Sequence, residues 1–171
     1  SELYIELYIA LAERKSKIMQ DKKIGVLGGS GEIGNRCVNI LKEKGYAVMA
    51  SYRTRKPMEN DKNVYVQLDI SNENELCMFM ANCDVVINCA GASFVNGEKI
   101  ARTAAKMKIP FVDPSGESFL EERIRDIQKD NVFVLSCGCF PGMTGVLLNF
   151  LCSQFDDFKS LSGMSISTEI L

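Results

Sequence analysis

The chain has 171 residues, of which 46% are hydrophobic and 25% are charged, a composition that is ordinary for one well-buried globular domain. The formal net charge of -2 gives no basic footprint, which argues against nucleic acid binding driven by the release of counterions. The chain has no histidine and no C-x-x-C pair, so the usual zinc ligand sets are missing and we predict no metal site.

The first segment, Ser1 to Lys17, carries many apolar residues, with acidic residues first and basic residues last. This order of charges suits the dipole of a helix, so we predict an amphipathic helix or extension over residues 1–20 that packs on the domain or on a neighbouring subunit. Sequence that is not native to the domain is the alternative. The segment is too short and too acidic at its front for a signal peptide or a membrane span, so we expect no membrane contact.

After Asp21, short apolar runs alternate with helical patterns, which predicts a parallel sheet with helices on both faces. The predicted strands are Lys23–Leu27, Ala47–Ser51, Val64–Leu68, Val85–Cys89, Phe111–Val112 and Val132–Ser136. The predicted helices are Glu32–Lys44, Glu73–Ala81, Gly97–Lys108, Phe119–Lys129 and Met143–Gln154. Six strands joined by five crossovers predict an α/β fold of the Rossmann type, a doubly wound parallel six-stranded sheet.

Two helix ends carry local signals in the sequence. Gly45 follows the first predicted helix, at a place where a left-handed cap favours glycine. Asn72 precedes the second predicted helix, and Glu75 comes three residues later. This spacing predicts a capping box with asparagine as the cap.

The strongest signal for function is the turn between the first predicted strand and helix, Gly28-Gly29-Ser30-Gly31-Glu32-Ile33-Gly34. Glycines at positions 28, 31 and 34 allow a tight turn, the approach of a pyrophosphate and close packing of helix on strand. The helix amino terminus then offers free N–H groups to the phosphates. We therefore predict that a dinucleotide binds on this turn, with a purely structural glycine turn as the alternative.

The end of the second predicted strand indicates which dinucleotide binds. An NAD site usually carries an acidic residue there for the ribose hydroxyls, whereas this chain has Ser51, Arg53, Arg55 and Lys56. Guanidinium groups bind phosphate oxygens in a bidentate manner, so these residues favour the 2′-phosphate of NADP(H) over NAD(H). A solvated charged turn is the alternative.

The ends of the third and fourth strands complete the predicted cofactor site. Asp69 and Ile70 would lie beside the adenine. The segment Asn88-Cys89-Ala90-Gly91 would lie under the ribose and the nicotinamide. These places follow from the rule that ligands of such sheets bind at the carboxyl ends of the strands.

Seven cysteines are scattered through the predicted strands and helices without framework spacings: Cys37, Cys77, Cys83, Cys89, Cys137, Cys139 and Cys152. An odd number of cysteines in this pattern indicates a reducing compartment, so we expect a cytoplasmic protein. Cys137 and Cys139 could form a redox or metal motif, but small buried cysteines at strand ends are more common. We interpret them as structural.

The sequence resembles one family more specifically. The glycine turn, Arg53, the segment Val85-Val-Ile-Asn-Cys-Ala-Gly91, the segment Phe111-Val-Asp-Pro-Ser-Gly-Glu117 and the turn Gly138-Cys-Phe-Pro-Gly142 together resemble the NADP-binding domain of saccharopine dehydrogenase-like oxidoreductases. The segment Gln67-Leu-Asp69-Ile belongs to the same resemblance, which covers about residues 21–157. It implies an NAD(P)-linked oxidation or reduction at a C–N or C=O centre.

In such proteins a second domain follows and supplies most of the groups that recognise the small-molecule substrate. The alternating pattern of residues 158–171 predicts the first strand of that domain, so we expect this chain to bind cofactor without turning over substrate. The candidates to face the nicotinamide are Asp113, Glu117, Cys139 and Phe140, with a capped turn or a packed loop as the alternative. We assign no catalytic residue. Sheet edges of this kind often pair, which makes a homodimer an open possibility.

Two other functions compete with this interpretation. A redox sensor that binds NADP(H) without catalysis, resembling the NmrA-like regulators, would use a similar nucleotide turn. A short-chain dehydrogenase that is complete in itself would need a Tyr-x-x-x-Lys pair near the fifth strand. That spacing occurs only at Tyr52 and Lys56, in the cofactor's ribose corner, so we reject this second alternative.

Overall fold

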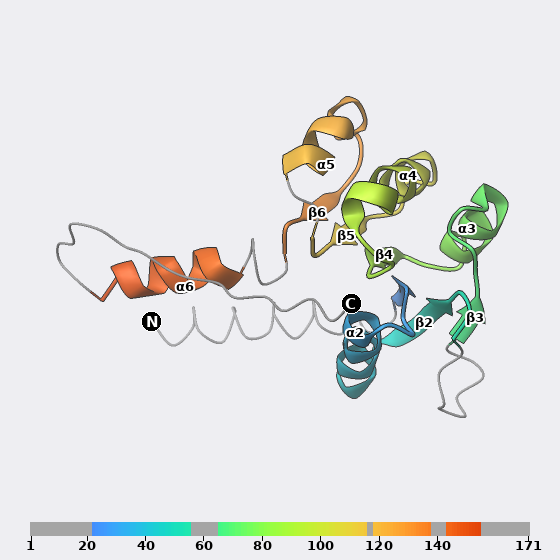
Figure 1. The fold of residues 1–171 in the computed structure, drawn as a ribbon, viewed down its shortest axis with the longest axis horizontal. Coiled ribbons are helices and arrows are strands. Elements are labelled where there is room, and N and C mark those ends of the chain that lie inside the picture. Colours follow the sequence, from blue (N-terminus) through green and yellow to red (C-terminus); the bar gives the residue numbers. More distant parts are fainter. Residues whose placement is uncertain (1–21, 56–64, 116–117, 138–142, 155–171) are drawn as a thin grey trace, which may run out of the picture.

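Six parallel strands form one sheet in the computed structural model, which describes residues 22–55, 65–115, 118–137 and 143–154 (Figure 1). The strands are β1 (Lys23–Leu27), β2 (Ala47–Tyr52), β3 (Tyr65–Gln67), β4 (Val85–Asn88), β5 (Phe111–Asp113) and β6 (Phe133–Leu135). Their order across the sheet is β3-β2-β1-β4-β5-β6, which is the order of the six-stranded dinucleotide-binding fold. The predicted α/β fold with a six-stranded parallel sheet is therefore confirmed.

β1 lies at the centre of the sheet because its apolar residues suit burial on both faces. Ile24 pairs with Val48 of β2 on one side and with Val85 of β4 on the other. Every residue of β1 after Lys23 is buried, as expected for a parallel strand covered by helices on both faces. The chain order of the strands reverses between β1 and β4, and such a reversal leaves a crevice at the carboxyl ends of the strands.

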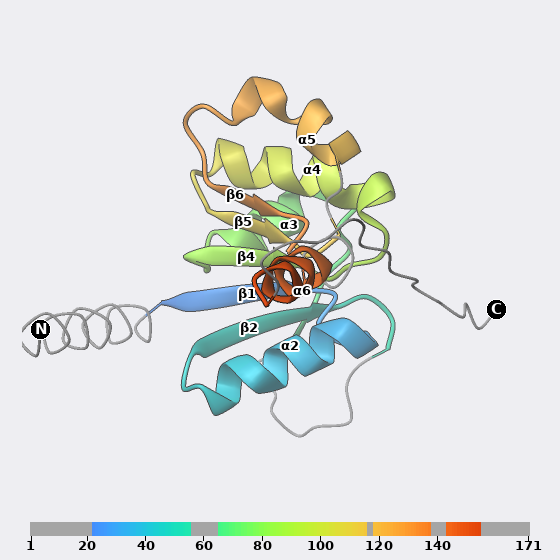
Figure 2. The ribbon, with the colours of Figure 1, turned by 90° about the vertical axis from the view of Figure 1, so that its left-hand side faces the viewer.

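Helices cover both faces of the sheet. They are α2 (Glu32–Glu43), α3 (Glu73–Met80), α4 (Ser93–Lys106), α5 (Ser118–Arg123) and α6 (Met143–Cys152), with a 3₁₀ turn η1 (Arg125–Ile127) after α5. α2 lies on one face, and α3 and α4 lie on the other (Figures 1 and 2). One buried cluster under α2 includes Val38 and Ala50, and a larger one under α3 and α4 includes Leu76 and Ile100. The core therefore consists of two layers separated by the sheet.

Both predicted helix signals are found in the structure. Gly45 has a φ of 81° just after α2, in the left-handed region. The Asn72 side chain caps α3 by accepting hydrogen bonds from the backbone N–H groups of Asn74 and Glu75, at 3.1 and 3.4 Å. The box closes differently from the usual pattern, because the Glu75 carboxylate bonds the Asn72 side-chain amide at 2.8 Å and the Asp69 backbone N–H at 3.0 Å. This arrangement fixes the loop between β3 and α3.

The predicted start of α4 at Gly97 is wrong, since the helix begins four residues earlier at Ser93. Gly97 lies inside the helix, where an added Cβ would come within 3.1 Å of the Leu120 side chain. The glycine thus serves the close approach of α4 and α5 rather than the start of a helix. Ser93 is buried at the helix start and its hydroxyl bonds Asp113, a contact that no local sequence signal indicates.

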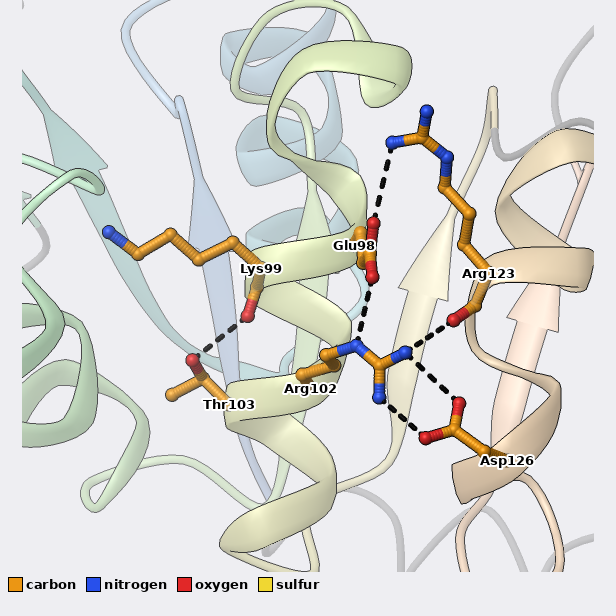
Figure 3. Close-up of polar contacts among 6 residues, drawn as sticks. All are labelled: Glu98, Lys99, Arg102, Thr103, Arg123 and Asp126. Carbon is orange, nitrogen blue, oxygen red and sulfur yellow. Dashed lines mark hydrogen bonds and ion pairs between the residues drawn. The ribbon is translucent and has the colours of Figure 1, made fainter.

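The predicted helix Phe119–Lys129 is also wrong, because α5 ends at Arg123 and only the 3₁₀ turn η1 follows. The Arg102 guanidinium reaches over from α4 and donates to the Arg123 carbonyl oxygen, which a continuing helix would use for its own hydrogen bond (Figure 3). The same guanidinium binds the Asp126 carboxylate through two nitrogens, at 2.9 and 3.0 Å, and Glu98 at 3.0 Å. These contacts raise the pKa of Arg102 and join α4 to η1.

Most strand boundaries differ from the prediction by one residue. β6 covers Phe133–Leu135 instead of Val132–Ser136, and Ser136 has a φ of 55°, which ends the extended conformation. Several predicted features lie outside the described residues: the helix over residues 1–20, Lys56, Val64, Glu117, Cys139, Phe140 and the strand within 158–171. Within the described part of the chain, we find no helix that is long and apolar enough to span a membrane.

Candidate cofactor-binding site

The glycine turn leaves β1 by a backbone path that admits no side chain at Gly28, Gly29 or Gly34. Gly28 has a φ of 71°, and a Cβ there would lie 2.5 Å from the carbonyl oxygen of Cys89, in the loop after β4. A Cβ on Gly34 would lie 2.2 Å from the Gly28 carbonyl oxygen. Glycine at 28 therefore permits the tight turn, and glycine at 34 permits α2 to pack against it.

Gly31 occupies a different environment at the start of α2. Its backbone is extended, with a φ of -75°, and its N–H donates to the Gly28 carbonyl oxygen at 3.0 Å. A Cβ on Gly31 would meet only that same oxygen, at 3.3 Å. No side chain caps α2 at this residue. The space in front of Gly31 is thus open, and the N–H groups of the first helical turn remain available to an anion.

A cleft of about 300 Å³ opens at the carboxyl ends of β1, β2 and β4, where the strand order reverses. From the glycine turn and the end of β2 it is lined by Gly28, Ser30, Gly31, Ser51, Arg53, Thr54 and Arg55. From the segments after β3 and β4 and from α4 it is lined by Leu68, Ile70, Cys89, Ala90, Gly91 and Asn96. The structure thereby brings together most of the residues that the sequence suggested for a cofactor.

Five of the predicted site residues do not line the cleft: Glu32, Ile33, Gly34, Asp69 and the buried Asn88. Gly34 is buried and serves packing, whereas Glu32 and Ile33 lie on the first turn of α2 with exposed side chains. The Asp69 carboxylate turns to its own loop and accepts a hydrogen bond from the Ser71 N–H at 2.9 Å. Hydrogen bonds from Ser71, with a smaller contribution from the charge of Arg53, lower the pKa of Asp69.

Ser51 fastens the glycine turn to β2. It is buried, and its hydroxyl oxygen accepts a hydrogen bond from the Gly28 N–H at 3.0 Å. The hydroxyl hydrogen remains for another acceptor in the cleft. Ser51 therefore positions the turn from the strand that also carries the arginines.

The cationic corner lies at the end of β2. Arg53 and Arg55 are exposed and line the cleft together with Thr54. The backbone of Arg53 is anchored because its carbonyl oxygen accepts a hydrogen bond from the Gln67 side chain at 3.1 Å. The corner thus joins a fixed backbone to long side chains that can adapt to a ligand.

Sequence reasoning missed the contribution of α4 to the cleft. Asn96, in the first turns of α4, lines the cleft and donates from its side-chain amide to the Ala90 carbonyl oxygen at 3.4 Å. The prediction began this helix at Gly97 and so left Asn96 outside it. Because α4 begins at Ser93, Asn96 is part of the helix and lies at the carboxyl edge of the sheet. Leu68, next to the end of β3, was missed as well.

Asp113 was a candidate to face the nicotinamide, and the structure corrects this assignment. Its side chain is wholly buried and is not among the described residues that line the cleft. Both carboxyl oxygens are occupied by hydrogen bonds from Asn88, Ser93 and Ser115. The Asp113 carboxyl group therefore bonds other groups of the protein instead of lining the cleft.

Two thiols meet beside the glycine turn. Cys37, on α2, forms a hydrogen bond with Cys89, which lowers the pKa of Cys37 to about 7 and raises the pKa of Cys89. Burial instead raises the pKa of Cys83 to about 11. Since the thiolate is the reactive form, we expect Cys37 to be the most nucleophilic of these three cysteines at neutral pH.

Comparison with known proteins agrees with this geometry. Residues 24–139 match the NAD dependent epimerase/dehydratase family. The apo form of saccharopine dehydrogenase (L-Glu forming) from Saccharomyces cerevisiae has a similar fold, with a TM-score of 0.64 and 19% identity over 78% of this chain and 31% of that protein. A short-chain dehydrogenase/reductase superfamily protein from Agrobacterium tumefaciens, with bound NAD, gives a TM-score of 0.53 and 16% identity over 66% of this chain and 48% of that protein.

The chain spans less than half the length of either of these two structures. The likeness in fold agrees with the resemblance to saccharopine dehydrogenase-like proteins that the sequence motifs indicated. At this level of identity it concerns the fold alone. A search of curated proteins finds no match to the sequence.

Proposed function

The chain belongs to the NAD dependent epimerase/dehydratase family, and from this premise we propose that it binds NADP(H) in the cleft as the cofactor-binding part of an oxidoreductase. The observation that carries the proposal is the open turn at Gly31 in the same cleft as Arg53 and Arg55. One end of this cleft suits a pyrophosphate, and another suits an additional phosphate.

The residues of the glycine turn fit the cofactor's pyrophosphate. Gly31 leaves room at the start of α2, where a β-carbon would meet nothing but the Gly28 carbonyl oxygen. The uncapped helix start presents N–H groups and the positive end of the helix dipole to the same space. Gly28, Ser30 and Gly31 would hold the phosphates, while Ser51 keeps the turn in place.

The arginines support NADP(H) over NAD(H). Arg53 and Arg55 line the cleft at the end of β2, where an NAD site usually has an acidic residue. None of the described residues that line the cleft is acidic, so nothing among them repels a 2′-phosphate. A charge-assisted contact is worth roughly 1.5–3 kcal/mol, or about tenfold to a hundredfold in affinity.

The bound cofactor would supply hydride transfer, and the residues of this chain would bind and orient it. The resemblance to saccharopine dehydrogenase-like proteins supports a substrate whose C–N or C=O centre is oxidised or reduced. Asp113, the one described candidate for contact with the nicotinamide, is buried and does not line the cleft. We therefore propose that the groups that act on the substrate come mainly from outside the described residues.

Calorimetric titration of the purified chain with NADPH and with NADH tests this function. We expect both to bind, with the dissociation constant for NADPH lower by about tenfold or more. Equal affinities, or a preference for NADH, would contradict the assignment of the arginines. Failure of both cofactors to bind would contradict the function itself.

A further inference from the structure

Asp113 ends β5 and has no exposed side-chain surface. A buried carboxyl group is costly unless its oxygens accept hydrogen bonds. One oxygen accepts from the Asn88 side-chain amide at 2.8 Å, and the other accepts from the Ser115 backbone N–H at 2.9 Å. The Ser93 hydroxyl lies 2.6 and 2.8 Å from the two oxygens. Asp113 thus joins the end of β4, the start of α4 and the turn after β5.

The partners of Asp113 are all neutral donors. The hydrogen bonds that reach it come from an amide, from hydroxyls and from a backbone N–H group. Among the described residues, no salt bridge involves this carboxyl group. Its arrangement is therefore that of a hub that orients polar groups.

The Asn88 side chain connects Asp113 to the wall of the cleft through two hydrogen bonds. While its amide nitrogen donates to Asp113, its amide oxygen accepts a hydrogen bond from the Ala90 N–H at 3.1 Å. A flipped amide would put two donors together at Ala90 and two acceptors together at Asp113, so Asp113 determines which way the amide points. Ala90 and the following Gly91, which has a φ of 73°, both line the cleft.

We propose that Asp113 is a positioning residue for the cofactor, acting through Asn88 to hold Ala90 and Gly91 in the conformation that receives the nicotinamide half. This inference rests on the proposed binding of NADP(H). β2 and β4 lie on opposite sides of β1, so the wall that Asp113 controls is across the cleft from the arginines. Asp113 therefore affects one half of the cofactor and leaves the 2′-phosphate corner unchanged.

The variant Asp113→Asn tests this positioning role. In one orientation the new amide puts an N–H group where the Asn88 amide needs an acceptor, and in the other it leaves the Ser115 N–H without an acceptor. We expect the dissociation constant for NADPH to rise by about tenfold or more. Adenosine 2′,5′-bisphosphate, which lacks the nicotinamide half, should keep its wild-type affinity. A purely structural role would lower the unfolding temperature and weaken both ligands together, so this comparison separates positioning from stability.

The double variant Asn88→Asp/Asp113→Asn provides a rescue. The new amide at 113 can donate to the new carboxylate at 88, whose second oxygen still accepts from the Ala90 N–H. We expect NADPH affinity to return to within about threefold of wild type, whereas Asn88→Asp alone places two carboxyl groups together and binds poorly. Asp126→Asn is a matched control that should change neither affinity, because Asp126 bonds Arg102 (Figure 3) and does not line the cleft.

The outcomes are distinguishable. Wild-type chain that binds neither NADPH nor NADH overturns the proposed function and this inference with it. Wild-type binding combined with unchanged NADPH affinity in Asp113→Asn overturns the inference alone. An equal loss of NADPH and bisphosphate binding in Asp113→Asn overturns it too. If Asp113→Asn does not fold, the double variant decides, and a folded double variant that fails to recover NADPH affinity overturns the inference.

Discussion

The hydroxyl of Ser51 on β2 accepts a hydrogen bond from the backbone N–H of Gly28 on the neighbouring turn, at 3.0 Å. This contact connects the strand that carries the arginines with the turn that we propose binds the cofactor's phosphates. It also satisfies a backbone donor at a partly buried position. The geometry of the cofactor cleft therefore depends on a side chain that is 2% exposed.

We predict that Ser51→Ala weakens both stability and cofactor binding. The Gly28 N–H loses its partner, at a cost of about 1–3 kcal/mol in the free energy of unfolding. Urea unfolding and NADPH titration measure the two effects. Ser153→Ala removes an exposed hydroxyl that bonds the Phe150 carbonyl oxygen on α6, and it should change stability by less than about 0.5 kcal/mol. Equal stability of Ser51→Ala and wild type would contradict the role of the contact.

Two glycine substitutions should separate binding from folding. Gly31→Val should leave a folded domain, because a Cβ there meets only the Gly28 carbonyl oxygen at 3.3 Å, and should abolish NADPH binding by filling the pyrophosphate space. Gly34→Ala should destabilise the domain by about 1–3 kcal/mol or more, since its Cβ would come within 2.2 Å of the same oxygen. Circular dichroism on heating, followed by titration, distinguishes the two. Normal NADPH binding by Gly31→Val would show that the turn is only structural.

Arg53→Ala should reduce the difference in affinity between NADPH and NADH. We expect NADPH affinity to fall by about tenfold to a hundredfold while NADH affinity stays near its wild-type value, because only NADPH carries the 2′-phosphate. Arg125→Ala, an exposed arginine of η1 that does not line the cleft, is the matched control. Parallel losses for both cofactors would argue that Arg53 supports the loop rather than the phosphate.

The pH dependence of alkylation should single out Cys37. Its pKa is lowered to about 7 by the hydrogen bond with Cys89, so its thiolate is half formed near neutral pH and its alkylation rate should level off above that pH. Cys83, whose pKa burial raises to about 11, should react slowly throughout this range. Peptide mass spectrometry after iodoacetamide treatment measures each site.

The variant Cys89→Ala tests the cause of this shift. Without the hydrogen bond from Cys89, the inflection for Cys37 should move upward toward the value of a free thiol, about 8.5. An inflection that is the same in the variant and in the wild type would mean that another group stabilises the Cys37 thiolate.

Much of the architecture could be predicted because its causes are local. The apolar run of β1, the turn signal at Gly28 and the cap at Asn72 act within a few residues, and each was recognised from its own segment. Strand order follows from the alternation of strands and helices, since right-handed crossovers leave few topologies. The position of the cleft then follows from the fold, at the reversal of strand order.

The sequence by itself determined the class of fold, the glycine turn and the cationic corner, because each rests on the chemistry of one short segment. Only the tertiary structure decided what distant segments do to each other. Arg102 ends α5 by taking the Arg123 carbonyl oxygen, and the buried Asp113 bonds Asn88, 25 residues earlier. Hydrogen bonds between segments that lie far apart in sequence depend on packing, and no periodicity of the chain records them.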